Sequence, residues 1–264
     1  MKVTLIDYTG CGHPDPMHAV NLLIFTKNTR LTMAPGLLQE IAAWPQEKKT
    51  SELEYMANTI PSSWEFVDYN FLIEEVSRGF THQFVRSRQF SFAQQTMRVL
   101  DVSTGPGWDY LTGPSIPQKE ASGMDEFWDE KEATLHALYH EHMKRTGDTY
   151  KALIREGAEV EDARGVLPTN ILTNIVGKCN MRTYVELARK RVSPRTQDEY
   201  RRVLEKMKQA ILEVHPWVSI FLERTVDRVI ADLQSSVNQL RAQGMSIERH
   251  THMTKLLDQL RAQV

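Results

Sequence analysis

The chain has 264 residues, of which 25% are charged, with 32 Lys and Arg against 34 Asp and Glu. A chain of this length can fold as one large domain with a substantial core. The formal net charge of −2 provides no overall field that would recruit nucleic acid or an acidic membrane. Residues 1–10 lack the pattern of a signal peptide, and no apolar run is long enough to span a bilayer. We therefore expect a cytoplasmic protein whose two cysteines, Cys11 and Cys179, are free thiols.

The first quarter of the chain alternates predicted strands, turns and helices. Residues 3–8 predict an opening strand, and residues 18–26 predict a helix after a turn-rich segment. Ser51 and Glu54 have the spacing of a capping box that begins a further short helix. Residues 64–73 are rich in aromatic side chains, and their periodicity leaves strand and buried helix both open.

Helical patterns dominate the second half of the chain. Repeated Gly and Pro between residues 101 and 123 predict an extended loop of the kind that often serves as a lid. Helical patterns then cover residues 124–156, 170–191, 196–214 and 218–263. No flexible spacer divides them. We therefore expect one mixed α+β domain over residues 1–264, in which helices dominate and a small sheet is antiparallel or mixed.

The most informative segment is residues 76–98, VSRGFTHQFVRSRQFSFAQQTMR. Val76, Phe80 and Phe84 have helical spacing and lead into the Arg86-Ser87-Arg88 triplet. Guanidinium groups are costly to bury without partners, so the arginines must face water or an anionic ligand. The neighbouring amides and hydroxyls would suit the ring edges of a phosphorylated ring compound. A solvated basic face is equally compatible with the composition.

A second polar cluster lies about 80 residues further along the chain and contains Arg164, Asn180, Arg182, Glu186, Arg189 and Arg191. Arg182, Glu186 and Arg189 follow an i, i+4, i+7 spacing, so they share one helical face and can pair with one another. Taken alone, this cluster favours internal ion pairing. Asn180 and Arg164 lie off that stripe and need another explanation.

The histidines give weaker signals. His136 and His140 stand four residues apart, but the intervening sequence lacks the glutamate of a zinc-protease motif. We interpret them as a solvated helix face, and we expect no metal at His250 and His252 either.

Together the two polar segments resemble the flavin-dependent thymidylate synthases. That family's motif is an Arg-His-Arg triplet, a serine three residues later, then Glu or Gln, Ser and Arg. The corresponding positions here are Arg86-Ser87-Arg88, Ser91, Gln94, Thr96 and Arg98. The second half agrees in order, with Arg164 before VLP, then Asn180, Arg182, Arg191, Gln197 and Glu199. The resemblance spans residues 64–200, and two separated motifs with matched spacing are more specific than either alone.

The resemblance implies reductive methylation of dUMP to dTMP. In this family methylenetetrahydrofolate supplies the methylene group, and FAD mediates hydride delivery from NADPH. The protein then provides no nucleophile, which agrees with the absence of a nucleophile motif around Cys179. The resemblance also implies a homotetramer with active sites at subunit interfaces.

Roles carry over by position from the family. The residues implied at FAD are Ser63, Arg86, Ser87, Arg88, Gln94, Asn180, Arg182 and Glu186. The residues implied at the nucleotide are Gln83, Arg86, Gln94, Thr96, Arg98, Arg164 and Arg191. Arg98 is expected at the phosphate. Arg191 is expected to be catalytic, because a fixed cation beside the uracil carbonyl favours the anionic ring and makes C5 more nucleophilic.

The chain also departs from the family pattern. Ser87 replaces the middle histidine, Ala93 the common Asn or Ser, Thr96 a serine and Val99 a tyrosine, and Glu186 replaces an asparagine that contacts flavin. A carboxylate near a flavin disfavours its anionic reduced form unless Arg182 or Arg189 neutralises it. These departures motivate two alternatives: a related methylase or hydroxymethylase acting on dCMP or dUMP, and a non-catalytic flavin- or nucleotide-binding protein.

Overall fold

A computed structural model describes residues 1–99, 101, 109–118, 128–191, 196–222 and 225–263. Their internal contacts divide the chain into two units. The sheet unit comprises Met1–Tyr8, Asp68–Cys179 and Arg191–Ala210, and the helical unit comprises Thr9–Val67, Asn180–Lys190 and Ile211–Val264. The expectation of a single domain over residues 1–264 stays a prediction.

The sheet unit is built on one four-stranded sheet in the order β1-β2-β4-β3. The strands are β1 (Lys2–Tyr8), β2 (Asp68–Ser77), β3 (Ser91–Gln94) and β4 (Leu172–Asn180). The β1–β2 and β3–β4 pairs are antiparallel. At the β2–β4 edge, Lys178 pairs with Asp68 at 3.2 Å, and the Arg78 N–H donates to the Ile171 carbonyl. Contacts at these opposite ends require that β2 and β4 are antiparallel as well.

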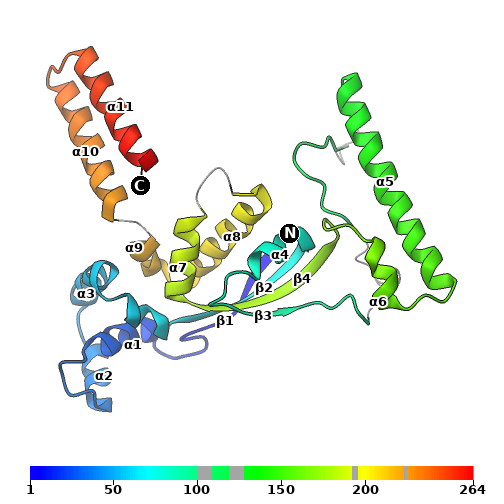
Figure 1. The fold of residues 1–264 in the computed structure, drawn as a ribbon. Coiled ribbons are helices and arrows are strands. Elements are labelled where there is room, and N and C mark those ends of the chain that lie inside the picture. Colours follow the sequence, from blue (N-terminus) through cyan, green and yellow to red (C-terminus); the bar gives the residue numbers. More distant parts are fainter. Residues whose placement is uncertain (100, 102–108, 119–127, 192–195, 223–224, 264) are drawn as a thin grey trace. The chain divides into compact units, whose positions relative to one another are not determined.

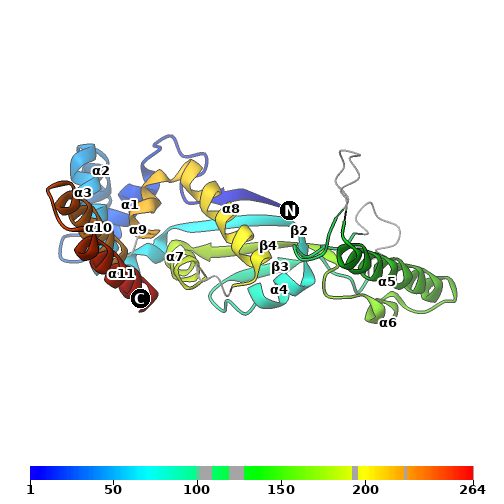
Figure 2. The same ribbon diagram turned by 90° about the horizontal axis from the view of Figure 1, so that it is seen from above.

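The sheet unit also contains helices. They are α4 (Arg78–Phe84), α5 (Glu130–Arg155), α6 (Val160–Ala163), the 3₁₀ turn η2 (Arg164–Val166) and α8 (Asp198–Val214), whose last residues belong to the helical unit. Helices α4 and α8 lie over one face of the sheet (Figures 1 and 2). Helix α5 begins with a capping box, in which Asp129 accepts from the Glu132 N–H and Glu132 accepts from the Asp129 N–H.

The helical unit contains the remaining elements, which are α1 (His18–Lys27), α2 (Pro35–Ala42), α3 (Gln46–Thr59), η1 (Pro61–Phe66), α7 (Met181–Lys190), η3 (Pro216–Val218), α9 (Ser219–Leu222), α10 (Thr225–Ala242) and α11 (Ile247–Gln263). Trp64 is a central core residue. Its ring meets the Phe221 ring edge-on at 5.0 Å, and its indole N–H donates to the Met56 carbonyl at 3.2 Å. Lys49 is buried, and its ammonium group donates to the Ala42 carbonyl.

The structure confirms the expected α+β class with dominant helices and a small antiparallel sheet. The predicted strand at residues 3–8 and the predicted helices at residues 18–26 and 196–214 are present, with ends shifted by at most two residues. Among the described residues, no helix is long and apolar enough to cross a bilayer.

Several expected elements differ. The first half of the predicted helix at residues 170–191 is strand β4, in which Thr173, Ile175, Gly177 and Cys179 are the buried, alternating residues. Ser51 does not begin a helix, because α3 already starts at Gln46, directly after Pro45. The helix predicted at residues 218–263 is broken into α9, α10 and α11, and Gly244 takes a left-handed conformation (φ 109°) in the turn between α10 and α11.

Two further segments are residues 64–73, which the sequence left open as strand or helix, and the predicted loop at residues 101–123. Residues 64–73 form the end of η1 and then most of β2, and Val76 belongs to β2 rather than to the helix that holds Phe80 and Phe84. Much of the predicted loop at residues 101–123 lies outside the described residues. In its described part, Tyr110 forms an isolated antiparallel β-bridge with Ile171.

We predict that His215 makes the protein acid-sensitive. Burial lowers the pKa of this histidine from 6.5 to about 4, since the folded state disfavours the charged ring. Its contribution to stability is therefore complete above pH 6.5 and is lost as the pH falls from 6.5 towards 4, by about 3 kcal/mol. Chemical unfolding of the wild type and of His215→Gln across this range should give a shallower pH slope for the variant. The exposed His82→Gln is the control, and equal slopes for all three proteins would contradict the prediction.

Candidate functional site

The Arg86-Ser87-Arg88 triplet forms a tight turn between α4 and β3 in the sheet unit. Backbone bonds close it, because the Arg86 N–H donates to the Gln83 carbonyl and the Ser87 N–H donates to the Phe84 carbonyl. Arg86 and Arg88 are exposed. Among the described residues, no carboxylate pairs with either guanidinium group. This leaves two adjacent cations available to an anion.

An aromatic cluster fixes the position of this turn. The buried Phe84 ring lies 5.1 Å from Phe80, 5.2 Å from Phe90, 5.0 Å from Phe92 and 6.0 Å from Tyr200. Gly177 on β4 permits this packing, since a Cβ there would come within 3.3 Å of the Phe84 ring. The rings before, after and beneath the triplet therefore hold its backbone rigidly on the sheet.

A buried carboxylate anchors the other end of α4. Glu199 is 2% exposed and accepts hydrogen bonds from the Ser77 N–H at 2.7 Å and from the Ser77 hydroxyl at 2.6 Å. The Ser77 hydroxyl in turn accepts from the Phe80 N–H, which caps α4. Glu199 thus fixes the start of α4, the helix whose other end leads into Arg86 and Arg88.

Two predicted glutamines lie beside α4 in different environments. The Gln83 amide donates to the Gln197 amide oxygen at 2.5 Å on the surface, and the Gln94 amide donates to the Thr81 hydroxyl at 3.0 Å. Because each contact uses one donor only, both amides retain further hydrogen-bonding capacity.

Three further residues predicted at the nucleotide, Thr96, Arg98 and Arg164, form a group with Glu161. The Arg98 guanidinium group pairs with the Glu161 carboxylate at 2.5 Å, and Arg164 donates from Nε to the Glu161 carbonyl. Thr96 accepts from the Arg98 N–H. Arg98 is 68% exposed, so its ion pair is readily exchanged for another anion.

Arg78 is a further candidate site residue, one that the motif did not indicate. Burial lowers the pKa of its guanidinium group, and the positive charge of Arg164 lowers it further. Its Nη1 atom is buried and has no hydrogen-bond partner. Like-charged groups held this close favour an anion between or beside them. The only sequence signal was the position of Arg78 at the start of the motif segment.

Arg191 packs on Tyr200. Its guanidinium carbon lies 5.0 Å from the centre of the Tyr200 ring, a cation–π arrangement. The Ser87 hydroxyl lies 3.5 Å from the Tyr200 hydroxyl on the same ring. Burial raises the pKa of Tyr200, while the hydrogen bond with Ser87 and the charge of Arg191 oppose that rise. Tyr200 thus brings together one residue from each of the two sequence motifs.

The helical unit holds the other four predicted cofactor residues. Ser63 is buried in η1, and the Asn180 side chain accepts from the Thr183 N–H at the start of α7. Arg182 donates to Glu186 at 2.9 Å and to Glu65 at 2.7 Å, and these hydrogen bonds raise its pKa. The ion pair expected within this cluster is therefore present, and Arg182 neutralises Glu186.

Arg189 donates to the Phe221 carbonyl at 2.7 Å instead of pairing with Glu186.

Cys179 is buried, which raises the pKa of its thiol well above the ordinary value. A thiol held neutral in this way is a poor nucleophile. The His136 and His140 rings on α5 lie 4.1 Å apart at a tilt of 40°, and the His136 ring contacts the Pro117 carbonyl.

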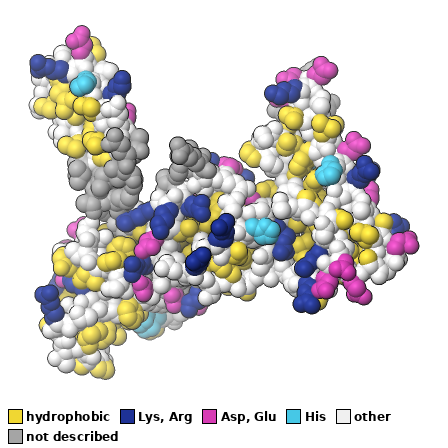
Figure 3. Space-filling model, viewed as in Figure 1, with side chains coloured by type: hydrophobic (Ala, Val, Ile, Leu, Met, Phe, Trp, Pro, Cys, Tyr) yellow, Lys and Arg dark blue, Asp and Glu magenta, His cyan; other side chains and the backbone are white. Residues whose placement is uncertain are grey.

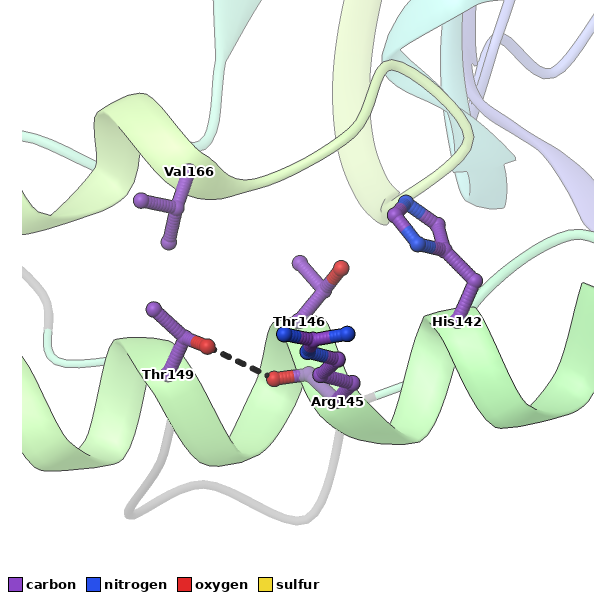
Figure 4. A pocket seen from close by; sticks show the side chains of 5 residues that line it. All are labelled: His142, Arg145, Thr146, Thr149 and Val166. Atoms are coloured by element: carbon purple, nitrogen blue, oxygen red, sulfur yellow. Dashed lines mark hydrogen bonds between the residues drawn. The ribbon is translucent and has the colours of Figure 1, made fainter.

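Two cavities of the sheet unit differ in their relation to these residues. One, of about 170 Å³, lies at α5 and η2 and is lined by His142, Arg145, Thr146, Thr149 and Val166 (Figure 4). It contains no predicted site residue and is smaller than typical ligand sites. A second, of about 370 Å³, is lined in part by Ser77, Thr169, Asn170 and Gln197. Through Gln197 it adjoins Gln83.

The sheet unit therefore combines an α+β fold on a small antiparallel sheet with an exposed, arginine-rich turn that is a candidate for binding an anion. The family model described as "Thymidylate synthase complementing protein" matches residues 5–217. The chain belongs to this family.

Individual relatives agree with the family match. The chain is 29% identical over 228 residues to a flavin-dependent thymidylate synthase of Clostridium tetani, and the alignment covers 82% of this chain and 84% of the relative. It is 34% identical over 160 residues to one of Nitratidesulfovibrio vulgaris, covering 58% of this chain and 59% of the relative. A crystal structure of the UMP/dUMP methylase PolB from Streptomyces cacaoi, bound with 5-Br dUMP, matches with a TM-score of 0.65 at 17% identity, covering 83% of this chain and 94% of that chain.

Proposed function

We propose that this protein is a flavin-dependent thymidylate synthase, an FAD-dependent methyltransferase that converts dUMP to dTMP. Methylenetetrahydrofolate supplies the one-carbon unit and NADPH supplies the reducing equivalents. The observation that carries the proposal is the match of the family model to residues 5–217, together with the exposed arginine turn on the sheet. FAD, when bound, supplies the redox chemistry, and the protein supplies binding, orientation and electrostatics.

The residues of the sheet unit would hold the nucleotide. Arg98 and Arg164 offer cations to its phosphate, with Thr96 and Arg86 beside them, and Gln83 and Gln94 offer amides to the sugar and base edges. The nucleotide phosphate would replace the Glu161 carboxylate at Arg98. Arg78 supports this assignment, because its buried, unpartnered Nη1 atom lies in a region where a second arginine already raises the positive potential.

Arg191 would act on the uracil ring. Its packing against the buried Tyr200 ring limits the freedom of a long side chain, so the cation is preorganised. A cation fixed beside a ring carbonyl stabilises negative charge as it develops there, and C5 becomes a better nucleophile. The raised pKa of the Cys179 thiol supports a mechanism without a cysteine nucleophile.

Each unit contains some of the candidate FAD residues. Arg86 and Arg88, exposed and without a carboxylate partner among the described residues, suit the diphosphate of a dinucleotide, with Ser87 and Gln94 alongside. In the helical unit, Ser63, Asn180, Arg182 and Glu186 are the candidates. The pairing of Glu186 with Arg182 supports its presence near a flavin, because the carboxylate is neutralised before the cofactor is reduced.

The assembly and location are further parts of the proposal. We propose a cytoplasmic homotetramer with active sites at subunit interfaces, which act on a small-molecule nucleotide and bind neither nucleic acid nor membrane. The resemblance to the flavin-dependent thymidylate synthases, which form such tetramers, motivates this part of the proposal.

A second candidate is a methylase or hydroxymethylase for another pyrimidine nucleotide, UMP or dCMP. Two observations support this candidate. The structure resembles that of a UMP/dUMP methylase, and Ser87 and Glu186 differ from the residues of the thymidylate synthase motif. A protein that binds FAD without catalysis would instead give no product with any nucleotide.

A product assay separates these functions. Purified protein should be yellow, or become so with added FAD, and should transfer label from methylenetetrahydrofolate to dUMP in the presence of NADPH. UMP and dCMP are offered in parallel. Label in UMP or dCMP but not in dUMP would select the second candidate, and flavin binding without labelled product would select the non-catalytic one.

We predict that Arg191→Ala loses most turnover but still binds nucleotide. The lost cation stabilised charge that develops only during reaction, so kcat should fall by about 10²-fold or more while the nucleotide dissociation constant changes little. Arg201→Ala, which removes a surface arginine paired with Asp198 at 2.7 Å, is the control. An unchanged kcat in Arg191→Ala would remove this residue from its role.

We predict that Glu161→Gln tightens nucleotide binding. The substitution removes the carboxylate that competes with phosphate for Arg98, and an exposed ion pair of this kind is worth enough to lower KM for dUMP by about two- to five-fold. Asp162→Asn, at the neighbouring exposed carboxylate, should leave KM unchanged. A higher KM in Glu161→Gln would show that Arg98 does not hold the phosphate.

A further inference from the structure

The C-terminal helices α10 and α11 form an antiparallel hairpin that lies beyond the part of the chain matched by the family model, which ends at residue 217. The two helices lie side by side (Figures 1 and 2). Since the family match does not extend to these helices, their apolar residues call for an explanation of their own.

Both helices follow a coiled-coil spacing. Ile230, Leu233, Val237 and Leu240 are separated by steps of three, four and three residues on α10. Met253, Leu257 and Leu260 are separated by steps of four and three on α11. This is the a/d pattern of helices that pack in a bundle.

The hairpin satisfies only half of that pattern. The a positions are covered within the hairpin: Ile230 is 3%, Val237 3% and Leu257 6% exposed, and the three form one small core. The d positions are not covered, because Leu233 is 46%, Leu240 45%, Met253 37% and Leu260 46% exposed. Leu256 is also 46% exposed. We refer to these exposed apolar residues of the two helices as the apolar stripe: Leu233, Leu240, Met253, Leu256 and Leu260. Figure 3 shows hydrophobic side chains, in yellow, on the face of this hairpin.

The net charge of the two helices indicates which kind of partner could cover the apolar stripe. In the sequence of the two helices, five basic residues stand against four acidic ones, so the charges nearly balance: Arg228, Arg241, Arg249, Lys255 and Arg261 against Asp227, Asp232, Glu248 and Asp258. Nucleic acid or an anionic membrane would need a basic face. A second copy of a nearly neutral hairpin meets no like-charge barrier, and its stripe has the same spacing to interdigitate with the first.

We propose that the α10–α11 hairpin is a self-association module that pairs with the hairpin of a second copy of this chain to form a four-helix bundle. The d positions become the centre of the interface between the copies. The pairing is independent of flavin and nucleotide, and it links protomers through a segment outside the family domain.

Cysteine cross-linking in the full-length chain tests the contact. The exposed Cys11 is replaced by serine, and the buried Cys179 is retained. Single cysteines are then placed at the d positions, in Leu233→Cys, Leu240→Cys, Met253→Cys and Leu260→Cys, and at the exposed c positions as matched controls, in Gln239→Cys and Gln259→Cys. Mild oxidation should give disulfide-linked dimers at one or more d positions, at several times the yield of either control.

A second variant tests the energetics. Leu240→Glu with Leu260→Glu should weaken association by 10-fold or more in sedimentation velocity, or halve the mass of the assembly, while Gln239→Glu with Gln259→Glu should not. If mass is unchanged but d positions cross-link specifically, the hairpins pair inside an assembly that other surfaces also hold, and the proposal stands.

Two results would overturn it. Cysteines at d positions that are protected from maleimide without forming dimers would show that the stripe is covered by its own chain. Cysteines at d positions that react as fast as those at c positions and do not cross-link would show that nothing covers it or that its partner is another protein.

Discussion

The arrangement of the proposed nucleotide site depends on the packing of the Phe84 ring. This ring is buried among Phe80, Phe90, Phe92 and Tyr200, and it lies over Gly177 on the sheet. The triplet between these rings has no freedom to turn inwards, so its arginines point to solvent. Apolar packing thus determines where charge is displayed, and the site needs no structural ion pair to hold its cations in place.

The arginine clusters of the two units differ in whether carboxylates balance them. In the helical unit, Arg182 is balanced by Glu65 and Glu186, and the charge is satisfied within the protein. In the sheet unit, Arg86 and Arg88 have no carboxylate partner among the described residues, and Arg78 and Arg164 repel each other. Positive potential is therefore concentrated around α4, although the net charge of the whole chain is close to zero. A local excess of this kind suits the phosphate groups of small ligands, such as the proposed diphosphate of FAD and the phosphate of the nucleotide.

Sequence alone predicted the fold class, the first strand, α1 and α8, since each has a clear period and a clear boundary. It failed at residues 172–180 because two of the four buried positions are Thr173 and Gly177, which give no apolar alternation in the sequence. Gly177 is explained only by the distant Phe84 ring. It failed at Ser51 because propensity to start a helix was outweighed by Pro45 upstream. At the site, motif spacing indicated the two arginine segments, but it could not reveal that Glu161 pairs with Arg98 or that Arg78 is partly buried, because both follow from tertiary packing.

The hydrogen bonds from Ser77 to Glu199 have a consequence for the order in which the molecule is made. The acceptor lies 122 residues after the donor. During synthesis, α4 emerges long before the carboxylate that anchors its cap, and a contact at such separation forms slowly because a long loop must close first. We therefore expect the ligand-binding turn to become ordered only after α8 has left the ribosome, so that a truncated chain does not sequester nucleotide prematurely.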